Sequence, residues 1–205
     1  LARLQVDTID LYWLHRDDPR RPVREILEVL NAEVRKGRIR YFGGSNWAWS
    51  RLDEANRVAR EQGLQPFSAS QSRWNLAVTG SELTEEQRME PGALVPVNGP
   101  DREWHARAGF PQIPYSPTAV GFFAGEEPAG RYAGLPGTAE RHRRARELAA
   151  RKGCSPNQVA LAWLLHQPFP VIPILGTSKV DNLRDALGAR EVELSAGEMA
   201  WLEEG

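Results

Sequence analysis

The sequence predicts an α/β fold on a parallel sheet, of the (β/α)8 TIM-barrel type, here a partial barrel of about five βα units with a C-terminal helix. Short apolar runs alternate five times with segments of helical periodicity, a pattern that gives parallel strands joined by crossover helices. The spacing G-x-G-x-x-G, which a doubly wound dinucleotide fold places after an early strand, does not occur. The barrel is therefore favoured over the doubly wound sheet.

The chain length supports a partial barrel. Eight units take about 250 residues, or roughly 30 per unit, so five units and a helix fit 205 residues. We therefore expect one domain over residues 1–205 whose N-terminal βα units are absent.

Composition sets limits on partners and compartment. The chain is 41% hydrophobic and 26% charged, with a formal net charge of -1, which gives no electrostatic argument for nucleic acid or an anionic membrane. The single cysteine, Cys154, excludes an intramolecular disulfide and fits a reducing compartment. No apolar run approaches the roughly 20 residues that cross a bilayer. We expect a cytoplasmic protein.

The strands are short apolar runs. The first is rich in aromatic residues and ends at His15, before charged residues and Pro19. Strands are expected at residues 9–15, 39–43, 66–71, 110–115 and 171–175.

The helices follow from apolar spacing and from caps. Val23, Leu27 and Leu30 share one face of the first helix. Ser155, Pro156 and Gln158 stand at the N-cap, N1 and N3 positions of a later one. Helices are expected at residues 22–36, 50–62, 101–108, 138–153, from 156, after Lys179 to about 187, and after Ser195.

Three stretches are predicted as loops. Residues 81–107 are interpreted as broken helix and loop, and residues 121–137 are either an active-site flap or a disordered insertion. Loops 16–21, 77–100 and 117–137 would set substrate specificity. His105 and His142 lie among charged residues and are expected on the surface, and no spacing of histidines and carboxylates suggests a metal site.

Polar residues stand where each strand ends, the edge at which such folds place their chemistry. At His15 the alternative is a histidine that caps a strand. Asn and Gln amides suit an amide ligand, a tyrosine ring suits stacking, and the hydroxyls and ammonium before a helix suit phosphate. A nicotinamide dinucleotide presents this combination. The residues are His15; Ser45 and Asn46; Gln71; Tyr115 and Ser116; and Gly176, Thr177, Ser178 and Lys179.

Six segments carry a resemblance to a known family. They are LQVDTIDLYWLHR, KGRIRYFGGSN, SASQSRWNL, IPYSP, SPNQVALAWLL and VIPILGTSKVDNL. In this order they resemble the aldo-keto reductases, so the resemblance implies reduction of a small aldehyde or ketone by hydride transfer from NAD(P)H.

The resemblance also implies residue roles. His15 would hydrogen-bond the substrate carbonyl, while Ser45, Asn46 and Gln71 would hold the nicotinamide carboxamide. Tyr115 would stack on the nicotinamide ring. The adenosine phosphates would lie near four residues of the last predicted strand end and helix: Thr177, Ser178, Lys179 and Asn182. Lys179 favours NADP, with NAD possible.

The chain departs from the family pattern at the proton donor. The family's acid tyrosine, with its lysine and aspartate, comes from strands that precede the histidine strand, so this chain alone is expected to be inactive. Tyr12 is no substitute, because it alternates with His15 and should face the helix layer. Gly44 stands where a larger residue is common, and Arg184-Asp185-Ala186 replaces a Glu-Asn pair near the adenine.

An alternative is a non-catalytic cofactor-binding or interaction module made of a truncated barrel. Its open sheet edges would pair with another chain, so an oligomer is possible.

Overall fold

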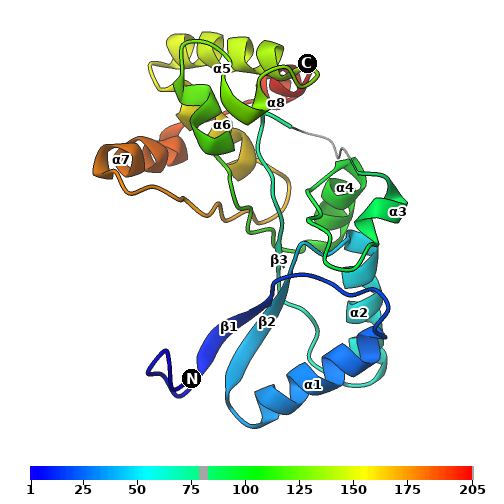
Figure 1. Ribbon diagram of the computed structural model, residues 1–205. Helices are drawn as coiled ribbons and strands as arrows, with labels where there is room; N and C mark the ends of the chain where they lie inside the picture. The colour runs from blue at the N-terminus through cyan, green and yellow to red at the C-terminus, as the bar shows by residue number, and fades with distance from the viewer. Residues whose placement is uncertain (79–82, 205) are drawn as a thin grey trace. The chain divides into compact units, whose positions relative to one another are not determined.

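The computed structural model describes residues 1–78 and 83–204 (Figure 1). They form two compact units, described separately below: unit 1 holds residues 1–72 and 83–112, and unit 2 holds residues 73–78 and 113–204. Residues 79–82, which belong to the predicted loop 77–100 and in part to the predicted irregular segment 81–107, lie outside the described residues.

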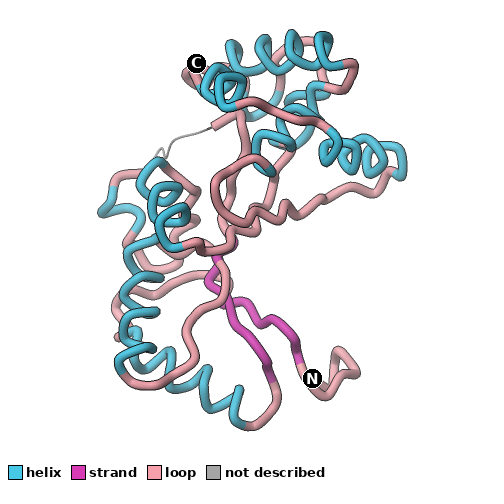
Figure 2. The backbone as a smooth tube through the Cα atoms, turned by 180° about the vertical axis from the view of Figure 1, so that it is seen from behind, coloured by secondary structure: helices cyan, strands magenta, loops and turns pink. Residues whose placement is uncertain are grey.

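Unit 1 contains a parallel sheet of the order β1-β2-β3, drawn in magenta in Figure 2. The strands are β1 (Ile9–Leu14), β2 (Ile39–Ser45) and β3 (Ser70–Gln71). Trp13 of β1 pairs with Gly43 of β2, and Ser45 pairs with Gln71. The prediction of a parallel sheet in an α/β fold is confirmed.

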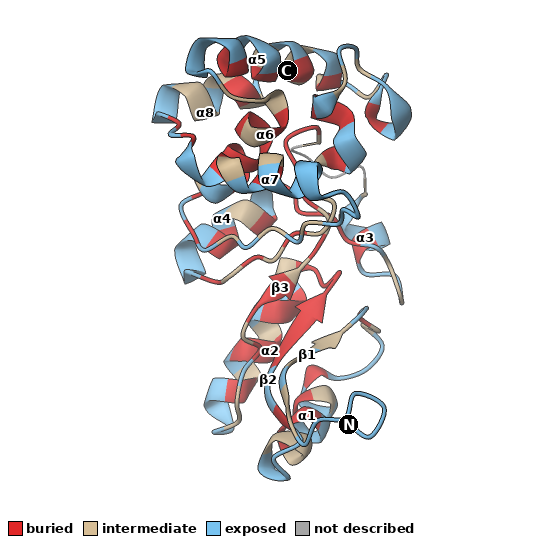
Figure 3. Cartoon of the chain, turned by 90° about the vertical axis from the view of Figure 1, so that its left-hand side faces the viewer, coloured by how far each residue is buried: buried red, intermediate tan, exposed pale blue. Residues whose placement is uncertain are grey.

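Two crossover helices build the core of unit 1. They are α1 (Val23–Arg35) and α2 (Trp49–Glu61), close to the predicted bounds. Leu27 of α1 and Leu52 of α2 are fully buried, as is Phe42 of β2, and belong to one hydrophobic cluster. Figure 3 shows the buried residues in red along the faces of α1 and α2.

The buried carboxylate of Asp101 connects the elements of the irregular part of unit 1. This part contains α3 (Glu85–Arg88) and α4 (Gly99–Ala108), each opened by a capping box. The Asp101 carboxylate accepts hydrogen bonds from Arg88 Nη2 at 2.5 Å, from the Asn98 N–H at 2.8 Å and from the Trp49 N–H at 3.3 Å. One carboxylate thus joins α2, α3 and the start of α4.

Unit 2 is helical and packs around α6 (Pro156–Leu165). This helix is apolar on all sides, and a helix of that composition is buried: residues 159–164 are all buried. The Trp163 ring packs edge-on against the Trp74 ring at 5.3 Å. The other elements are η1 (Ala119–Ala124), η2 (Gly130–Tyr132), α5 (Thr138–Lys152), α7 (Val180–Gly188), η3 (Ala189–Glu191) and α8 (Ala196–Glu203).

Three predicted strands differ from the structure. Of residues 66–71 only Ser70–Gln71 form a strand, and residues 110–115 form only isolated bridges at Gln112 and Tyr115. Residues 171–175 form no named strand, although the Ile174 N–H donates to the Pro114 carbonyl at 2.9 Å. These segments contain or adjoin Pro66, Pro111, Pro114, Pro170 and Pro173. Because proline lacks an N–H, continuous ladders cannot form there.

The structure also bears on the predictions for the segment 121–137, for Tyr12 and for membrane-spanning helices. The segment 121–137 is not a disordered insertion, because Phe122, Phe123 and Tyr132 are buried. Tyr12, expected to face the helix layer, is 40% exposed. In the part of the chain that the structure describes, we find no helix long and apolar enough to cross a membrane.

Candidate functional site

Four predicted site residues lie together in unit 1, at the carboxyl ends of the strands. Asn46 connects them. Its backbone N–H donates to the Gln71 carbonyl at 3.0 Å, and its Nδ2 donates to the His15 carbonyl at 3.2 Å and to Ser45 Oγ at 3.0 Å. Ser45 and Asn46 are buried, whereas His15 is exposed and Gln71 is half-buried. The ends of β1, β2 and β3 are thus tied through one residue, whose side-chain amide reaches His15 and Ser45 and whose backbone N–H reaches Gln71.

The backbone geometry at this point is specific. Asn46 has a φ of 57°, in the left-handed region that asparagine tolerates better than most residues. Gly43 lies under the Trp13 ring, which a Cβ at Gly43 would overlap. A Cβ at Gly44 would lie 3.0 Å from both Leu52 Cδ2 and Trp47 Cγ, so a side chain at this position would require these neighbours to shift.

The loop that follows His15 is held by buried and exposed polar contacts. Arg51 Nε donates to Asp17 Oδ2 at 2.9 Å, and Arg51 Nη2 donates to the Arg21 carbonyl at 2.9 Å. Burial alone would lower the pKa of Arg51, but the hydrogen bond and charge of Asp17 raise it. Arg16 Nη1 donates to the Gly92 carbonyl at 2.9 Å. The predicted specificity loop 16–21 is therefore anchored to α2.

The remaining predicted site residues lie in unit 2. The Tyr115 carbonyl accepts from the Trp74 N–H at 3.4 Å, and the Ser116 carbonyl accepts from Asn75 Nδ2 at 3.1 Å. Ser116 has a φ of 54°, and the adjacent η1 turn contains two more non-glycine residues with positive φ, Ala119 and Val120. This backbone conformation is costly for valine, and such strain is common beside ligand sites.

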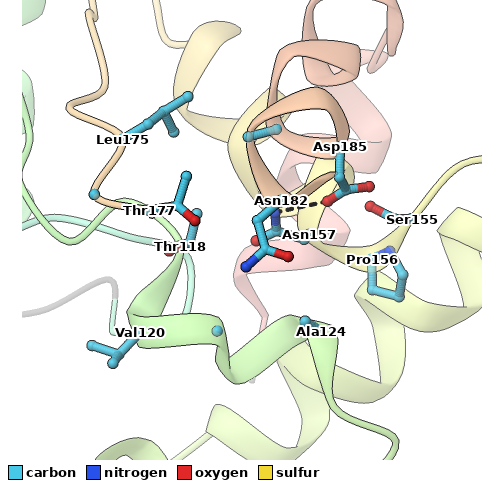
Figure 4. A pocket seen from close by; sticks show the side chains of 13 residues that line it. Thr118, Val120, Ala124, Ser155, Pro156, Asn157, Leu175, Thr177, Asn182 and Asp185 are labelled. Atoms are coloured by element: carbon cyan, nitrogen blue, oxygen red, sulfur yellow. Dashed lines mark hydrogen bonds between the residues drawn. The ribbon is translucent and has the colours of Figure 1, made fainter. Parts of the chain in front are cut away.

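A cavity of about 530 Å³ lies in unit 2 between η1 and the first turns of α6 and α7 (Figure 4). Of the predicted residues, Gly176, Thr177 and Asn182 line it. Thr177 Oγ1 accepts from the Lys179 N–H at 3.1 Å, which closes the turn before α7. Ser178 and Lys179 are exposed beside this turn and are not among the lining residues.

Two polar residues that line this cavity were not among the predicted site residues. Asn157 Nδ2 donates to Asp185 Oδ2 at 3.0 Å, and both side chains line the cavity. Asn157 follows Ser155 and Pro156, a signal that we interpreted only as a helix start. Asp185 lies in α7, and it belongs to the stretch Arg184-Asp185-Ala186 that the resemblance placed near the adenine, although it was not predicted as a site residue.

Two histidines predicted on the surface are buried instead. His105 Nδ1 lies 2.7 Å from the Phe110 carbonyl, and burial lowers the pKa of His105 to about 4. His142 packs against the Phe122 ring at 5.2 Å, and burial lowers its pKa as well. Charged neighbours such as Glu103 and Arg143 are exposed, and these neighbours misled the prediction. No group of three potential metal ligands occurs among the described residues.

The comparisons with known proteins agree with one another. The chain matches the model of the Aldo/keto reductase family over residues 1–204. It is 32% identical over 211 residues to the probable aldo-keto reductase 1 of Glycine max, covering 95% of this chain and 54% of that protein. It resembles the crystal structure of a thermostable aldo-keto reductase in complex with the inhibitor epalrestat, with a TM-score of 0.73 and 28% identity, over 99% of this chain and 62% of that one.

The chain therefore spans 54% of the curated relative and 62% of the solved structure. Because the matching model extends over residues 1–204, both compact units take part in the match. The chain belongs to the aldo/keto reductase family.

Proposed function

We propose that this chain is the C-terminal, cofactor-holding part of an NAD(P)H-dependent oxidoreductase that reduces a small aldehyde or ketone. One observation carries the proposal most strongly: Asn46 ties the carboxyl ends of β1, β2 and β3 together beside His15. Buried amide and hydroxyl groups at that edge suit an amide ligand, because they offer donors and acceptors in fixed directions.

The proposed roles are those that the resemblance to the family implies. Ser45, Asn46 and Gln71 would hold the nicotinamide carboxamide, and Tyr115 and Ser116 would lie against its ring. Gly176, Thr177, Ser178, Lys179 and Asn182 would bind the adenosine phosphate end, with the Lys179 ammonium favouring NADP over NAD. The nicotinamide, when bound, supplies the hydride.

His15 has a supporting role in this proposal. Its exposed ring would orient the substrate carbonyl by a hydrogen bond, but the developing alkoxide also needs a proton donor. In the proposed enzyme a tyrosine, with a lysine and an aspartate, comes from strands outside these 205 residues. We take the two compact units as parts of one (β/α)8 domain, five βα units of which lie in this chain.

Two measurements test the proposal. The 205-residue chain is titrated with NADPH and with NADH while its tryptophan fluorescence is followed, and saturable binding that favours NADPH is expected. The chain joined to the preceding strands of its coding sequence is then assayed for NADPH oxidation with a panel of aldehydes and ketones.

Carbonyl-dependent oxidation by the joined form, absent from the 205-residue chain, would support the reductase. Binding without turnover in the joined form would indicate a non-catalytic cofactor-binding module. Failure of both forms to bind either dinucleotide would refute the proposal.

A further inference from the structure

The chain between α3 and α4 forms a loop that is closed at its base. Arg88, which is buried, donates from Nη1 to the Pro96 carbonyl at 2.9 Å and from Nη2 to Asp101 Oδ2 at 2.5 Å. Val95 and Val97 are buried as well. The residues that follow Arg88 therefore return to the same arginine, and we call them the 89–97 loop.

The tip of the 89–97 loop is a tight turn. The Ala93 N–H donates to the Glu90 carbonyl at 3.1 Å, which closes a four-residue turn with Pro91 and Gly92 in the middle. Gly92 has a φ of 76°. Proline at the second position and a positive φ at the third are typical of a type II turn, in which glycine is favoured at the third position. The turn therefore fixes the directions of both polar backbone groups of Gly92.

Both of these groups bind the segment that directly follows His15. The Gly92 N–H donates to the Asp17 carbonyl at 2.9 Å, and the Gly92 carbonyl accepts from Arg16 Nη1 at 2.9 Å. On the other side, the His15 carbonyl accepts from Asn46 Nδ2 at 3.2 Å. The backbone is thus held at His15 itself and again two residues later, by two different parts of unit 1.

This clamp adds direction to a ring that has little else to fix it. β1 ends at Leu14, so His15 lies outside the strand, and its side chain is exposed. The bond from Arg16 to Gly92 is exposed too, and exposed hydrogen bonds of this kind add little to stability. Orientation is a different matter, since a displacement of about 1 Å at a reacting centre can cost about 100-fold in rate.

We propose that Gly92 and Arg16 are positioning residues for His15. By fixing the backbone on the carboxyl side of His15, they set the direction in which its imidazole meets a substrate carbonyl. Neither residue needs to touch the substrate. The inference rests on the proposed function, in which His15 orients the carbonyl, and it assigns to the 89–97 loop a part in that alignment.

The first test measures the motion of the His15 ring in the 205-residue chain, without any cofactor. Carbon-13 relaxation of the histidine Cε1–H groups gives an order parameter for each ring, and His15→Gln identifies the His15 signal. Arg16→Met removes the guanidinium but keeps an aliphatic stem, and Gly92→Ala strains the turn at its positive φ. Both variants are expected to lower the order parameter of His15 and to leave those of the buried His105 and His142 unchanged.

Gly63→Ala is the matched control. Gly63 also has a positive φ, 63°, and an added Cβ meets nothing within 4 Å, so the variant carries the same kind of backbone strain. It lies after α2, away from the clamp between Gly92 and the segment that follows His15. Gly63→Ala should therefore lose stability as Gly92→Ala does and should keep the His15 order parameter of the wild type.

The second test uses the form joined to the preceding strands. Arg16→Met is expected to lower kcat about tenfold with KM changed less than about twofold, because misdirection of His15 weakens an interaction that matters most in the transition state. Arg16→Lys, which can still donate to the Gly92 carbonyl, should recover part of kcat. Gly63→Ala should leave both constants unchanged.

The outcomes separate this inference from the proposed reductase. A His15 ring that stays as ordered in Arg16→Met and Gly92→Ala as in the wild type overturns the inference, even where the joined form reduces carbonyls. A ring loosened equally by Gly63→Ala also overturns it. Loosening in the two clamp variants alone supports the positioning of His15, whereas a joined wild type that reduces no carbonyl refutes the reductase and leaves the relaxation result standing.

Discussion

Arg51 Nε of α2 and Asp17 Oδ2 of the loop after His15 lie 2.9 Å apart, with both side chains less than a tenth exposed. The pair connects the first crossover loop to the second helix. A buried pair of this kind contributes little net stability as a pair, but removal of one partner leaves an uncompensated buried charge.

Arg51→Met is therefore expected to lower the free energy of unfolding by about 3 kcal/mol. Urea denaturation at neutral pH measures the change. The matched control is Arg24→Met, which removes the exposed ion pair with Glu28 on α1 and should cost less than about 1 kcal/mol. Equal losses in the two variants would show that burial of the Arg51–Asp17 pair is energetically unimportant.

The stability of the chain should fall in mild acid because of His105. Its pKa is lowered to about 4 by burial, whereas an unfolded histidine titrates near 6.5. The unfolded state therefore binds the proton first, and the stability present above pH 6.5 is lost progressively as the pH falls toward 4, by up to about 3 kcal/mol.

His105→Phe should flatten the stability profile between pH 6.5 and pH 4. Unfolding free energies at pH 7 and at pH 4.5, measured in urea for both proteins, give the two slopes. His142, whose pKa is also lowered by burial, contributes in the same direction and remains in the variant. A slope unchanged in His105→Phe would exclude His105 as its main source.

Gly43→Ala should destabilise unit 1, because the added Cβ would overlap the Trp13 ring on the neighbouring strand. Overpacking of this kind costs about 1–3 kcal/mol. Thermal melting is the measurement, and Trp13→Leu in the same chain should recover part of the loss.

Gly197→Ala in α8 is the control for Gly43→Ala, since nothing lies within 4 Å of its added Cβ. A stabilisation of up to about 1 kcal/mol is expected there from helix propensity. A loss at Gly197 equal to that at Gly43 would contradict the explanation by the Trp13 contact.

Asn46→Ala should weaken NADPH binding about tenfold, because Nδ2 no longer holds His15 and Ser45. Asn46→Gly separates the two contributions of this residue. Glycine relieves the strain at a φ of 57° but lacks the amide, so it should recover stability without recovering binding. Recovery of binding in the glycine variant would show that the backbone, rather than the amide, is the essential part.

The helices and the first two strands could be predicted because their signals are local. The apolar face of α1 and the capping box of Ser155 with Gln158 are each determined by residues that lie close together in the sequence. The later strands depend on partners far along the chain, so an extended segment such as residues 171–175 could be recognised without its pairing. The prolines in these segments already indicated that regular strand pairing would be interrupted there.

The candidate site, like the fold, could be predicted only where its signals are local in the sequence. Polar residues at strand ends are visible in the sequence, and the structure brings His15, Ser45, Asn46 and Gln71 together. Asn157 and Asp185 could not be found this way, because the cavity that joins them forms only when α6 and α7 pack.

The Asp101 carboxylate has a consequence for how this sequence can change over generations. Because Arg88, Asn98 and Trp49 all donate to it, loss of the acid leaves a buried guanidinium behind, and loss of the arginine leaves a buried carboxylate. Neither substitution is neutral by itself, so this ion pair can be replaced during evolution only if both residues change. Residues 88 and 101 should therefore be inherited and replaced together among close relatives of this chain, whereas exposed ion pairs such as Arg24 with Glu28 should drift independently.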